Sequence, residues 1–169
     1  MKEIERIIRV DHAGERGAIS IYSAQLTIAR FLYKDMVPVL EDMLSHEREH
    51  YLRFDLLLKA RGIRQCYGLV FWRVGEAVLG TVTALLGRNA VWVCTDSIET
   101  TVLHHLQWQL DFLEMHDTEA HAAVLSIKRD EENHQNMGQQ NGTQSLVYKP
   151  IFGLVKQSTR FAIWLSTKL

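Results

Sequence analysis

The most constraining feature of this chain is a set of four glutamates and two histidines that occurs in two equally spaced halves. In each half, one glutamate precedes a Glu-x-x-His motif by 32 positions, and the second half repeats the first after 84 positions. The six residues are Glu15, Glu47 and His50 in the first half and Glu99, Glu131 and His134 in the second. A single Glu-x-x-His motif is common, but two copies in one register indicate two homologous helix hairpins that face one another.

Each of these polar residues lies on the apolar stripe of an expected helix. Glu47 and His50, for example, share a helix face with Met43, Phe54 and Leu57. Burying several carboxylates without partners is costly, because each loses its hydration and repels the others. Two divalent cations would neutralise four carboxylates and give the imidazoles a partner. The pattern therefore predicts a metal site inside a helical bundle.

The ligand types narrow the choice of metal. Two helices that each supply a Glu and two that each supply a Glu-x-x-His form the arrangement of ferritin-like di-iron and di-manganese carboxylate proteins. Mixed oxygen and nitrogen ligation excludes a soft thiolate site and suits two iron ions, and it does not exclude manganese. A surface role for each acid taken singly is the alternative, and the shared register argues against it for the set.

Helical spacing of apolar residues dominates the whole chain, and alternating β-branched runs with hairpin turns are absent. We expect an all-α fold, a ferritin-like four-helix bundle with two additional apolar or amphipathic helices, in a single di-iron domain over residues 1–169. The two repeated hairpins are expected at about 2–60 and 89–138. Helices are expected at about 4–26, 37–60, 66–86, 89–115, 119–138 and 150–168, the fifth ending at Gly138 and the "NGTQ" that follows.

Composition excludes several classes of protein. A formal net charge of −1, without a basic stripe, gives no electrostatic case for a nucleic-acid partner. The two cysteines, Cys66 and Cys94, form no Cys-x-x-Cys motif, which argues against a zinc ribbon, a disulfide framework or the four-cysteine site of a rubrerythrin. The charged start "MKEIERIIRVDHAGE" does not resemble a secretory signal.

Two stretches are apolar enough to require a comparison with membrane segments. Residues 66–90 are interrupted by Arg73 and Glu76, and their longest uncharged run, 77–87, is shorter than the roughly 20 residues of a bilayer span. Residues 151–169 have the pattern of a helix that lies in a membrane interface. Packing in the core of the bundle is the alternative for both stretches, and spanning is not expected.

Further polar residues lie close to the ligand set. Three aspartates within a turn of ligands are candidates for orienting the imidazoles, against ordinary solvated or capping roles: Asp11, Asp96 and Asp130. His105 is a candidate proton relay that faces the site, although a lone histidine on a helix is more often simply packed. His12 is expected to be a structural histidine. The histidines expected at the surface are His46, His116 and His121.

Several segments resemble the demethoxyubiquinone hydroxylase family, and the resemblance covers nearly the whole chain. They are "IIRVDHAGERGAISIYSAQ", "HEREHYLRF", "IETTVLHH" and "RDEENHQNMG", together with "GTVTALLG" and "AIWLSTKL". Arg16 and Leu106 stand where members of the family have tyrosine, and "DEENH" departs from the family's last motif. These departures remove none of the six predicted ligands, but they affect residues near the site.

The resemblance implies a di-iron monooxygenase that uses O2 and an external reductant, with NADH as a candidate electron donor. The substrate would be demethoxyubiquinone, a prenylated quinone, whose ring is hydroxylated in ubiquinone biosynthesis. The implied location is peripheral, on the cytoplasmic face of a bacterial inner membrane or the matrix face of the mitochondrial inner membrane. A lipid-binding partner protein and a quinone-synthesis complex are the implied partners. Residues expected to line an apolar entrance are Val70, Phe71, Leu79, Leu85, Leu86, Phe161 and Trp164.

Other functions use similar ligands. A ferritin-like ferroxidase or iron-binding protein would need no organic substrate and no apolar third helix. A manganese catalase shares the ligand pattern but gives no reason for the membrane-like helices. A metal-free scaffold in a quinone-synthesis complex gives no reason to keep six polar residues on apolar stripes.

Overall fold

The computed structural model describes residues 2–142 and 145–168, and within them the chain is helical with no strand. The α-helices are α1 (Lys2–Leu32), α2 (Val37–Ala60), α3 (Leu69–Leu85), α4 (Arg88–Leu113), α5 (Thr118–Asn141) and α6 (Lys149–Ser166). Short 3-10 helices precede α2 (Lys34–Met36) and α6 (Leu146–Tyr148). The expected all-α class is confirmed.

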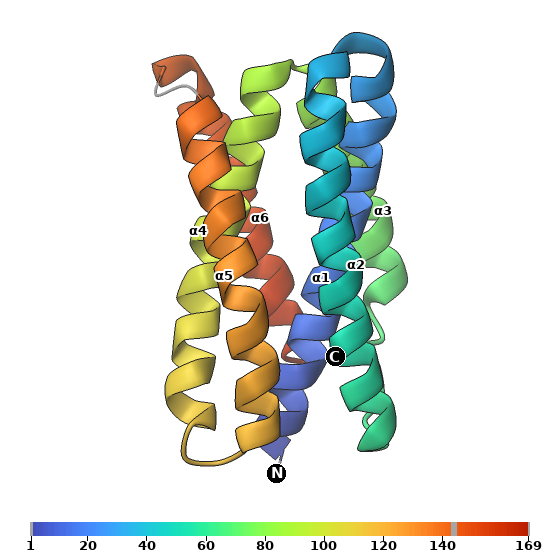
Figure 1. The fold of residues 1–169 in the computed structure, drawn as a ribbon, viewed down its shortest axis with the longest axis vertical. Coiled ribbons are helices and arrows are strands. Elements are labelled where there is room, and N and C mark those ends of the chain that lie inside the picture. The colour runs from blue at the N-terminus through green and yellow to red at the C-terminus, as the bar shows by residue number, and fades with distance from the viewer. Residues whose placement is uncertain (1, 143–144, 169) are drawn as a thin grey trace.

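Four of the helices form a bundle. α1 packs along α2, α4 packs along α5, and the two pairs meet through α2 with α5 and α1 with α4. Figure 1 shows the pairs side by side, with α1 and α2 on one side and α4 and α5 on the other. The predicted ferritin-like four-helix bundle is confirmed.

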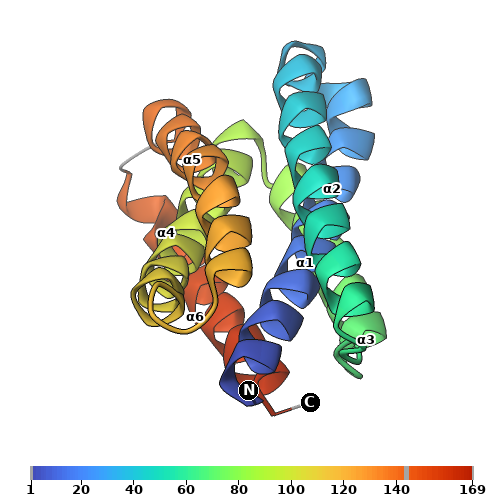
Figure 2. The same cartoon turned by 60° about the horizontal axis from the view of Figure 1, so that its bottom comes forward.

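The two remaining helices cover the outside of this bundle. α3 packs against α1, and α6 packs against α4, as the rotated view in Figure 2 also shows. The contact of α3 with α1 is close at Gly80, where an added Cβ would lie 2.4 Å from the carbonyl oxygen of Ile21. Gly80 therefore allows the close approach of the two helices.

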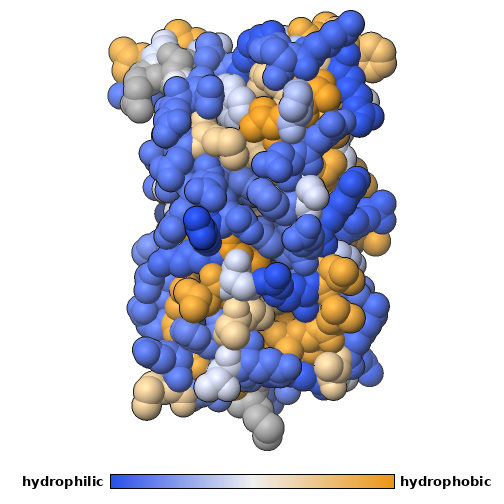
Figure 3. Space-filling view, viewed as in Figure 1, coloured by the Kyte–Doolittle hydropathy of each residue, from blue (hydrophilic) through white to orange (hydrophobic). Residues whose placement is uncertain are grey.

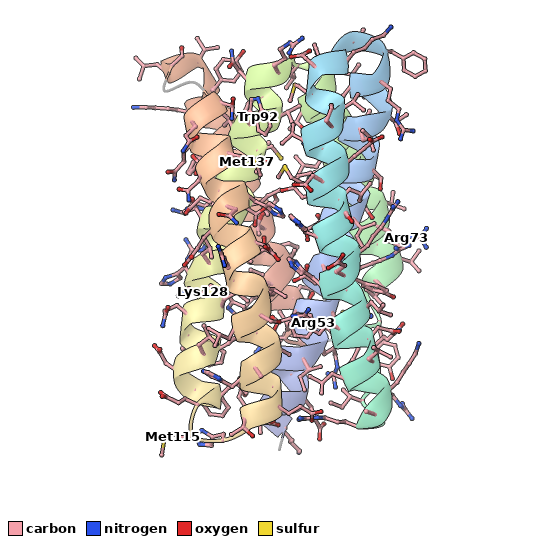
Figure 4. All side chains as sticks on the ribbon, viewed as in Figure 1. Arg53, Arg73, Trp92, Met115, Lys128 and Met137 are labelled. Carbon is pink, nitrogen blue, oxygen red and sulfur yellow. The ribbon has the colours of Figure 1, made fainter. Side chains whose placement is uncertain are left out.

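Two of the apolar clusters lie at opposite ends of the bundle. The cluster near the N-terminus and the α4–α5 turn contains Ile8, Phe54 and Ile127. The cluster at the other end contains Trp92 and is packed by Met137, which Figure 4 shows near each other on α4 and α5. The ligand candidates lie between these clusters along each helix, so the polar layer is closed off at both ends.

Three expected helix boundaries were wrong. α1 continues beyond residue 26 to Leu32. α3 begins at Leu69 rather than near Cys66, because Cys66 is buried in a turn and its carbonyl oxygen accepts from Leu69 N. α5 continues through Gly138 to Asn141. Gly138 acts as a packing residue, since an added Cβ would lie 2.7 Å from the backbone nitrogen of Asp96 on α4. Residues 143–144 of the expected "NGTQ" break lie outside the described residues.

Apolar side chains on the surface gather on α3 and α6. The exposed apolar residues of α3 are Val70, Phe71, Val74, Val78, Val82 and Leu85, and those of α6 are Leu154, Phe161 and Trp164. The face that α2 and α5 present in Figure 3 is mostly hydrophilic in its upper half and carries hydrophobic patches in its lower half. None of the described helices has the length and apolarity required to cross a membrane.

Candidate metal centre

The six residues predicted from the repeat come together in the middle of the bundle, and all six are buried. They form two overlapping groups, in each of which one potential ligand atom per residue lies within 4.8 Å of the others. The first group is Glu15, Glu47, His50 and Glu131, and the second is Glu47, Glu99, Glu131 and His134. Glu47 and Glu131 belong to both groups, so each of them lies between two potential metal positions.

The two oxygens of each shared glutamate face different histidines. Glu131 Oε1 lies 3.2 Å from Nδ1 of His50, and Glu131 Oε2 lies 3.5 Å from Nδ1 of His134. Glu47 has the same relation, with Oε1 at 3.2 Å from His134 Nδ1 and Oε2 at 4.0 Å from His50 Nδ1. This is the geometry that a carboxylate needs to bridge two ions.

The donor atoms inside the site are left without hydrogen bonds. Nδ1 of His50, Nδ1 of His134 and Oε1 of Glu47 are all buried and lack a hydrogen-bond partner, despite their close neighbours. Buried polar atoms nearly always find a partner, because an unpartnered one retains its full desolvation cost. These three unpartnered atoms belong to the two ligand groups and are nitrogen and oxygen donors. Such a set of donors fits divalent iron or manganese.

The pKa values of the ligand residues in the metal-free site differ strongly from their ordinary values. Burial raises the pKa of Glu15 to about 7, and burial together with the nearby Glu131 raises the pKa of Glu47 and of Glu99 well above the ordinary value. Burial opposes the charged form of His50, but the adjacent carboxyl groups of Glu131 and Glu15 prevail and raise its pKa to about 12. In metal-free protein, protons therefore take the positions that metal ions would neutralise.

The outward nitrogen of each histidine is held by a side chain from the opposite hairpin. His50 Nε2 lies 3.1 Å from Oδ2 of Asp130, and His134 Nε2 lies 3.2 Å from Nδ1 of His46. Asp130 thus has the position expected of an orienting residue. His46 was expected at the surface, but it is partly buried and contacts His134. It occupies the position equivalent to Asp130 in the repeat, 84 residues earlier.

The other aspartates do not contact the imidazoles. Asp11 accepts a hydrogen bond of 2.6 Å from Gln109, and Asp96 accepts from Thr100 and Gln139. The expectation that they orient the histidines was wrong because each is paired with an amide side chain on a neighbouring helix.

Two further residues complete the surroundings of the site. Tyr22 donates a hydrogen bond of 2.8 Å to Glu99 Oε1, a role that the sequence analysis missed because Tyr22 lies on an apolar stripe. His12 is fully buried, and its Nε2 lies 3.6 Å from Oδ1 of Asp55, in keeping with a structural histidine.

A cavity adjoins the metal centre between α1, α3, α4 and α6. Its wall includes Glu15, Glu47, Glu99 and Glu131, and His105 lines it as the sequence suggested. α6 contributes Thr159, Ala162, Ile163 and Ser166. The seven residues expected at an apolar entrance are not part of this lining: Leu79 packs in an interior cluster, and Val70, Phe71, Leu85, Leu86, Phe161 and Trp164 are exposed.

Comparisons with known proteins show the family of this chain. The family model described as "Ubiquinone biosynthesis protein COQ7" matches residues 2–166. NADPH-dependent 3-demethoxyubiquinone 3-hydroxylase, mitochondrial, of Dictyostelium discoideum is 36% identical over 98% of this chain and 77% of that protein. The 3-demethoxyubiquinol 3-hydroxylase of Rhodospirillum rubrum is 35% identical over 98% of this chain and 78% of that protein. The NADPH-dependent enzyme of Homo sapiens is 33% identical over the same shares. The chain therefore belongs to the COQ7 family of ubiquinone biosynthesis proteins.

Proposed function

We propose that this protein hydroxylates the ring of a prenylated demethoxyquinone, as the names of its relatives state for them. The observation that carries the proposal is the pair of overlapping ligand groups beside a cavity lined largely by apolar side chains. A ferroxidase would need the ligand groups alone, whereas the cavity gives an organic ring access to them. We also propose that residues 1–169 form one ferritin-like domain built from two repeated hairpins, 2–60 and 89–138.

We propose that the six buried residues hold two iron ions, and manganese would fit the same donors. Glu47 and Glu131 would bridge the ions. Glu15 with His50 would complete one coordination sphere, and Glu99 with His134 the other. Bound iron supplies the activation of O2 and the electron transfer that ring hydroxylation requires.

The residues around the ions have distinct tasks in this proposal. Asp130 and His46 fix the orientation of the two imidazoles, and Tyr22 holds Glu99 through its hydroxyl group. The apolar clusters at both ends of the bundle exclude bulk water from the reacting groups. His105 lines the cavity and is the candidate for proton transfer, and burial lowers its pKa, which favours the neutral imidazole.

The electrons must come from a separate reductant. The sequence suggested NADH, and several relatives are named as NADPH-dependent. We propose a reduced nicotinamide as the donor, and parallel assays with NADH and NADPH distinguish the two.

We propose that the exposed apolar residues of α3 and α6 seat the protein on a membrane surface, from which the isoprenoid tail of the substrate enters. The bilayer would be the bacterial inner membrane on its cytoplasmic face, or the mitochondrial inner membrane on its matrix face. A lipid-binding partner protein or a quinone-synthesis complex would engage the same region. A helix with such an exposed apolar face lies in the interface plane rather than across the bilayer.

Charged substitutions on this surface test the membrane proposal. The double variant Phe71→Asp and Val78→Asp is expected to reduce co-sedimentation with anionic liposomes at least tenfold, because two exposed apolar side chains of α3 are replaced by negative charge. Met115→Asp is the control, since Met115 is at least as exposed as Phe71 and Val78 but lies at the α4–α5 turn, where Figure 4 labels it. Equal liposome binding by the double variant and the control would contradict the proposal.

Product analysis tests the catalytic proposal. Iron-loaded protein is incubated with a demethoxyquinone, a reduced nicotinamide and O2, and the quinone is analysed by mass spectrometry while iron per chain is counted. We expect a product heavier by one oxygen atom, with the label retained when 18O2 is used. Iron-loaded protein that oxidises ferrous iron but yields no hydroxylated quinone would instead favour a ferroxidase.

A further inference from the structure

A carboxyl group of α3 lies in the cavity without a polar partner. Glu76 lines the cavity together with four glutamates of the metal centre, but it is not among their ligand groups. No hydrogen bond or ion pair of Glu76 is formed with any described residue, and burial alone raises its pKa to about 7. Glu76 is half-buried, and desolvating an unpaired carboxyl group costs free energy that no hydrogen bond or ion pair compensates. Its position is therefore better explained by a ligand than by stability.

A second unpartnered polar group lies one helical turn away. Trp72 precedes Glu76 by four residues, so both side chains lie on the same face of α3, and both line the cavity. Nε1 of Trp72 is buried and has no hydrogen-bond partner. The two residues thus offer one N–H donor and one carboxyl group in a wall that also contains apolar side chains such as Ile98 and Val102.

The fold leaves room for the carboxyl group of Glu76 on α1. A Cβ added at Gly17 would lie 2.8 Å from Cδ and 2.9 Å from Oε2 of Glu76. Any side chain at position 17 would therefore displace the carboxyl group. Gly17 keeps this space beside the same segment of α1 that carries Glu15.

We propose that Trp72 and Glu76 bind the ring oxygen atoms of the quinone or quinol substrate, an inference that rests on the proposed function. Trp72 Nε1–H would donate to a carbonyl, hydroxyl or methoxy oxygen. The Glu76 carboxyl group would accept from a ring hydroxyl of the quinol, or donate to a quinone carbonyl when protonated. Ala162 and Ile163 of α6 would pack against the ring and the start of its tail. Two polar contacts and an apolar wall fix the orientation of a planar ring in front of the metal centre.

Binding and kinetics of variants test this site. The ligand is a demethoxyquinol with a two-isoprene tail, measured by calorimetry with the anaerobic iron-loaded enzyme and by steady-state kinetics in detergent. Glu76→Ala and Trp72→Phe are each expected to raise Kd and KM about tenfold with a smaller change in kcat, the effect of one lost hydrogen bond to a partner held in a buried site. Glu76→Gln, which keeps hydrogen-bonding groups, is expected to restore most of the affinity. Glu114→Gln is the control, since Glu114 is exposed at the end of α4.

A double-mutant cycle isolates the placement of the carboxyl group. Gly17→Ala displaces Glu76 and is expected to raise KM in the wild-type background, but not further in the Glu76→Ala background. Equal effects of Gly17→Ala in both backgrounds would contradict the position assigned to Glu76. Melting temperatures separate binding from folding, because Glu76→Ala removes no hydrogen bond or ion pair of the carboxyl group and is not expected to lower Tm.

The outcomes distinguish this inference from the function on which it rests. Hydroxylation by the wild type with unchanged Kd and KM in Glu76→Ala and Trp72→Phe would overturn the binding site alone. Quinol binding that depends on Glu76 and Trp72, without hydroxylation by the iron-loaded wild type, would support the binding site and overturn the proposed function.

Discussion

Replacing Glu131 by alanine is expected to remove both bound metal ions and to reduce ring hydroxylation at least a thousandfold. Glu131 belongs to both ligand groups, and its two carboxylate oxygens face the two histidines separately. Glu15→Ala and Glu99→Ala each remove a ligand from one group only. We therefore expect about one metal ion per chain in each of these two variants and close to none in Glu131→Ala, measured by elemental analysis after desalting.

The neighbouring residue provides the control. Glu132→Ala removes an exposed carboxylate whose partner is Lys128 at 3.7 Å, and exposed ion pairs contribute little to stability. It is expected to retain both ions and full activity. Far-ultraviolet circular dichroism should show similar helical content in all four variants, because the apolar clusters at both ends of the bundle are untouched. Two ions retained by Glu131→Ala would contradict the ligand assignment.

The sequence predicted that the six buried residues lie together, because the spacing of residues within each helix determines which face carries them. A Glu-x-x-His motif on an apolar stripe places both side chains on one inward face, whatever the partner helix is. The interval of 32 residues places the single glutamate and the motif at the same level of a hairpin. The repeat after 84 residues then brings the two hairpins to the same level.

Contacts between the hairpins could not be predicted in the same way. His46 with His134, Tyr22 with Glu99, and Gln109 with Asp11 join residues 77 to 98 positions apart. Such contacts depend on how far one helix is rotated and shifted against another, which no spacing within a helix reveals.

The roles of the glycines and of the outer helices also depend on contacts between helices, which the sequence of one helix does not reveal. Gly138 resembles a helix end in the sequence, but its lack of a side chain serves the close contact with α4. Residues of α3 were expected to line an entrance on apolarity alone, whereas rotation of the helix turns Trp72 and Glu76 to the cavity and Phe71 to the surface. Only the packing of α3 on α1 decides which face is inside.

The metal-free protein is expected to become less stable as pH rises from about 5 to 8. Glu15 has a pKa of about 7 in the folded state and about 4.5 when unfolded, so the folded state holds a proton that the unfolded chain releases between these values. His50 and His134 have folded pKa values of about 12 and 11, whereas the unfolded imidazoles release their protons near pH 6.5. They therefore extend the loss of stability above pH 6.5. Glu131 has the opposite effect, because the two adjacent imidazoles outweigh burial and lower its pKa to about 2. Its contribution to stability is lost only below about pH 4.5.

Bound metal is expected to cancel this pH dependence, because the ions replace the protons at the same ligands. Each site filled at a hundredfold excess over Kd adds about 2.7 kcal/mol to the free energy of unfolding. For a chain of this length, two such sites correspond to a rise in Tm of roughly 10 to 20 °C. The gain should be larger at pH 8 than at pH 6, since fewer protons must then be displaced. Thermal unfolding with and without anaerobic Fe²⁺ or Mn²⁺, over pH 5 to 8, measures this rise in Tm. Glu131→Ala should show no metal-dependent rise, and parallel Tm curves for metal-free and metal-loaded wild type would mean that ions do not bind at these carboxylates and imidazoles.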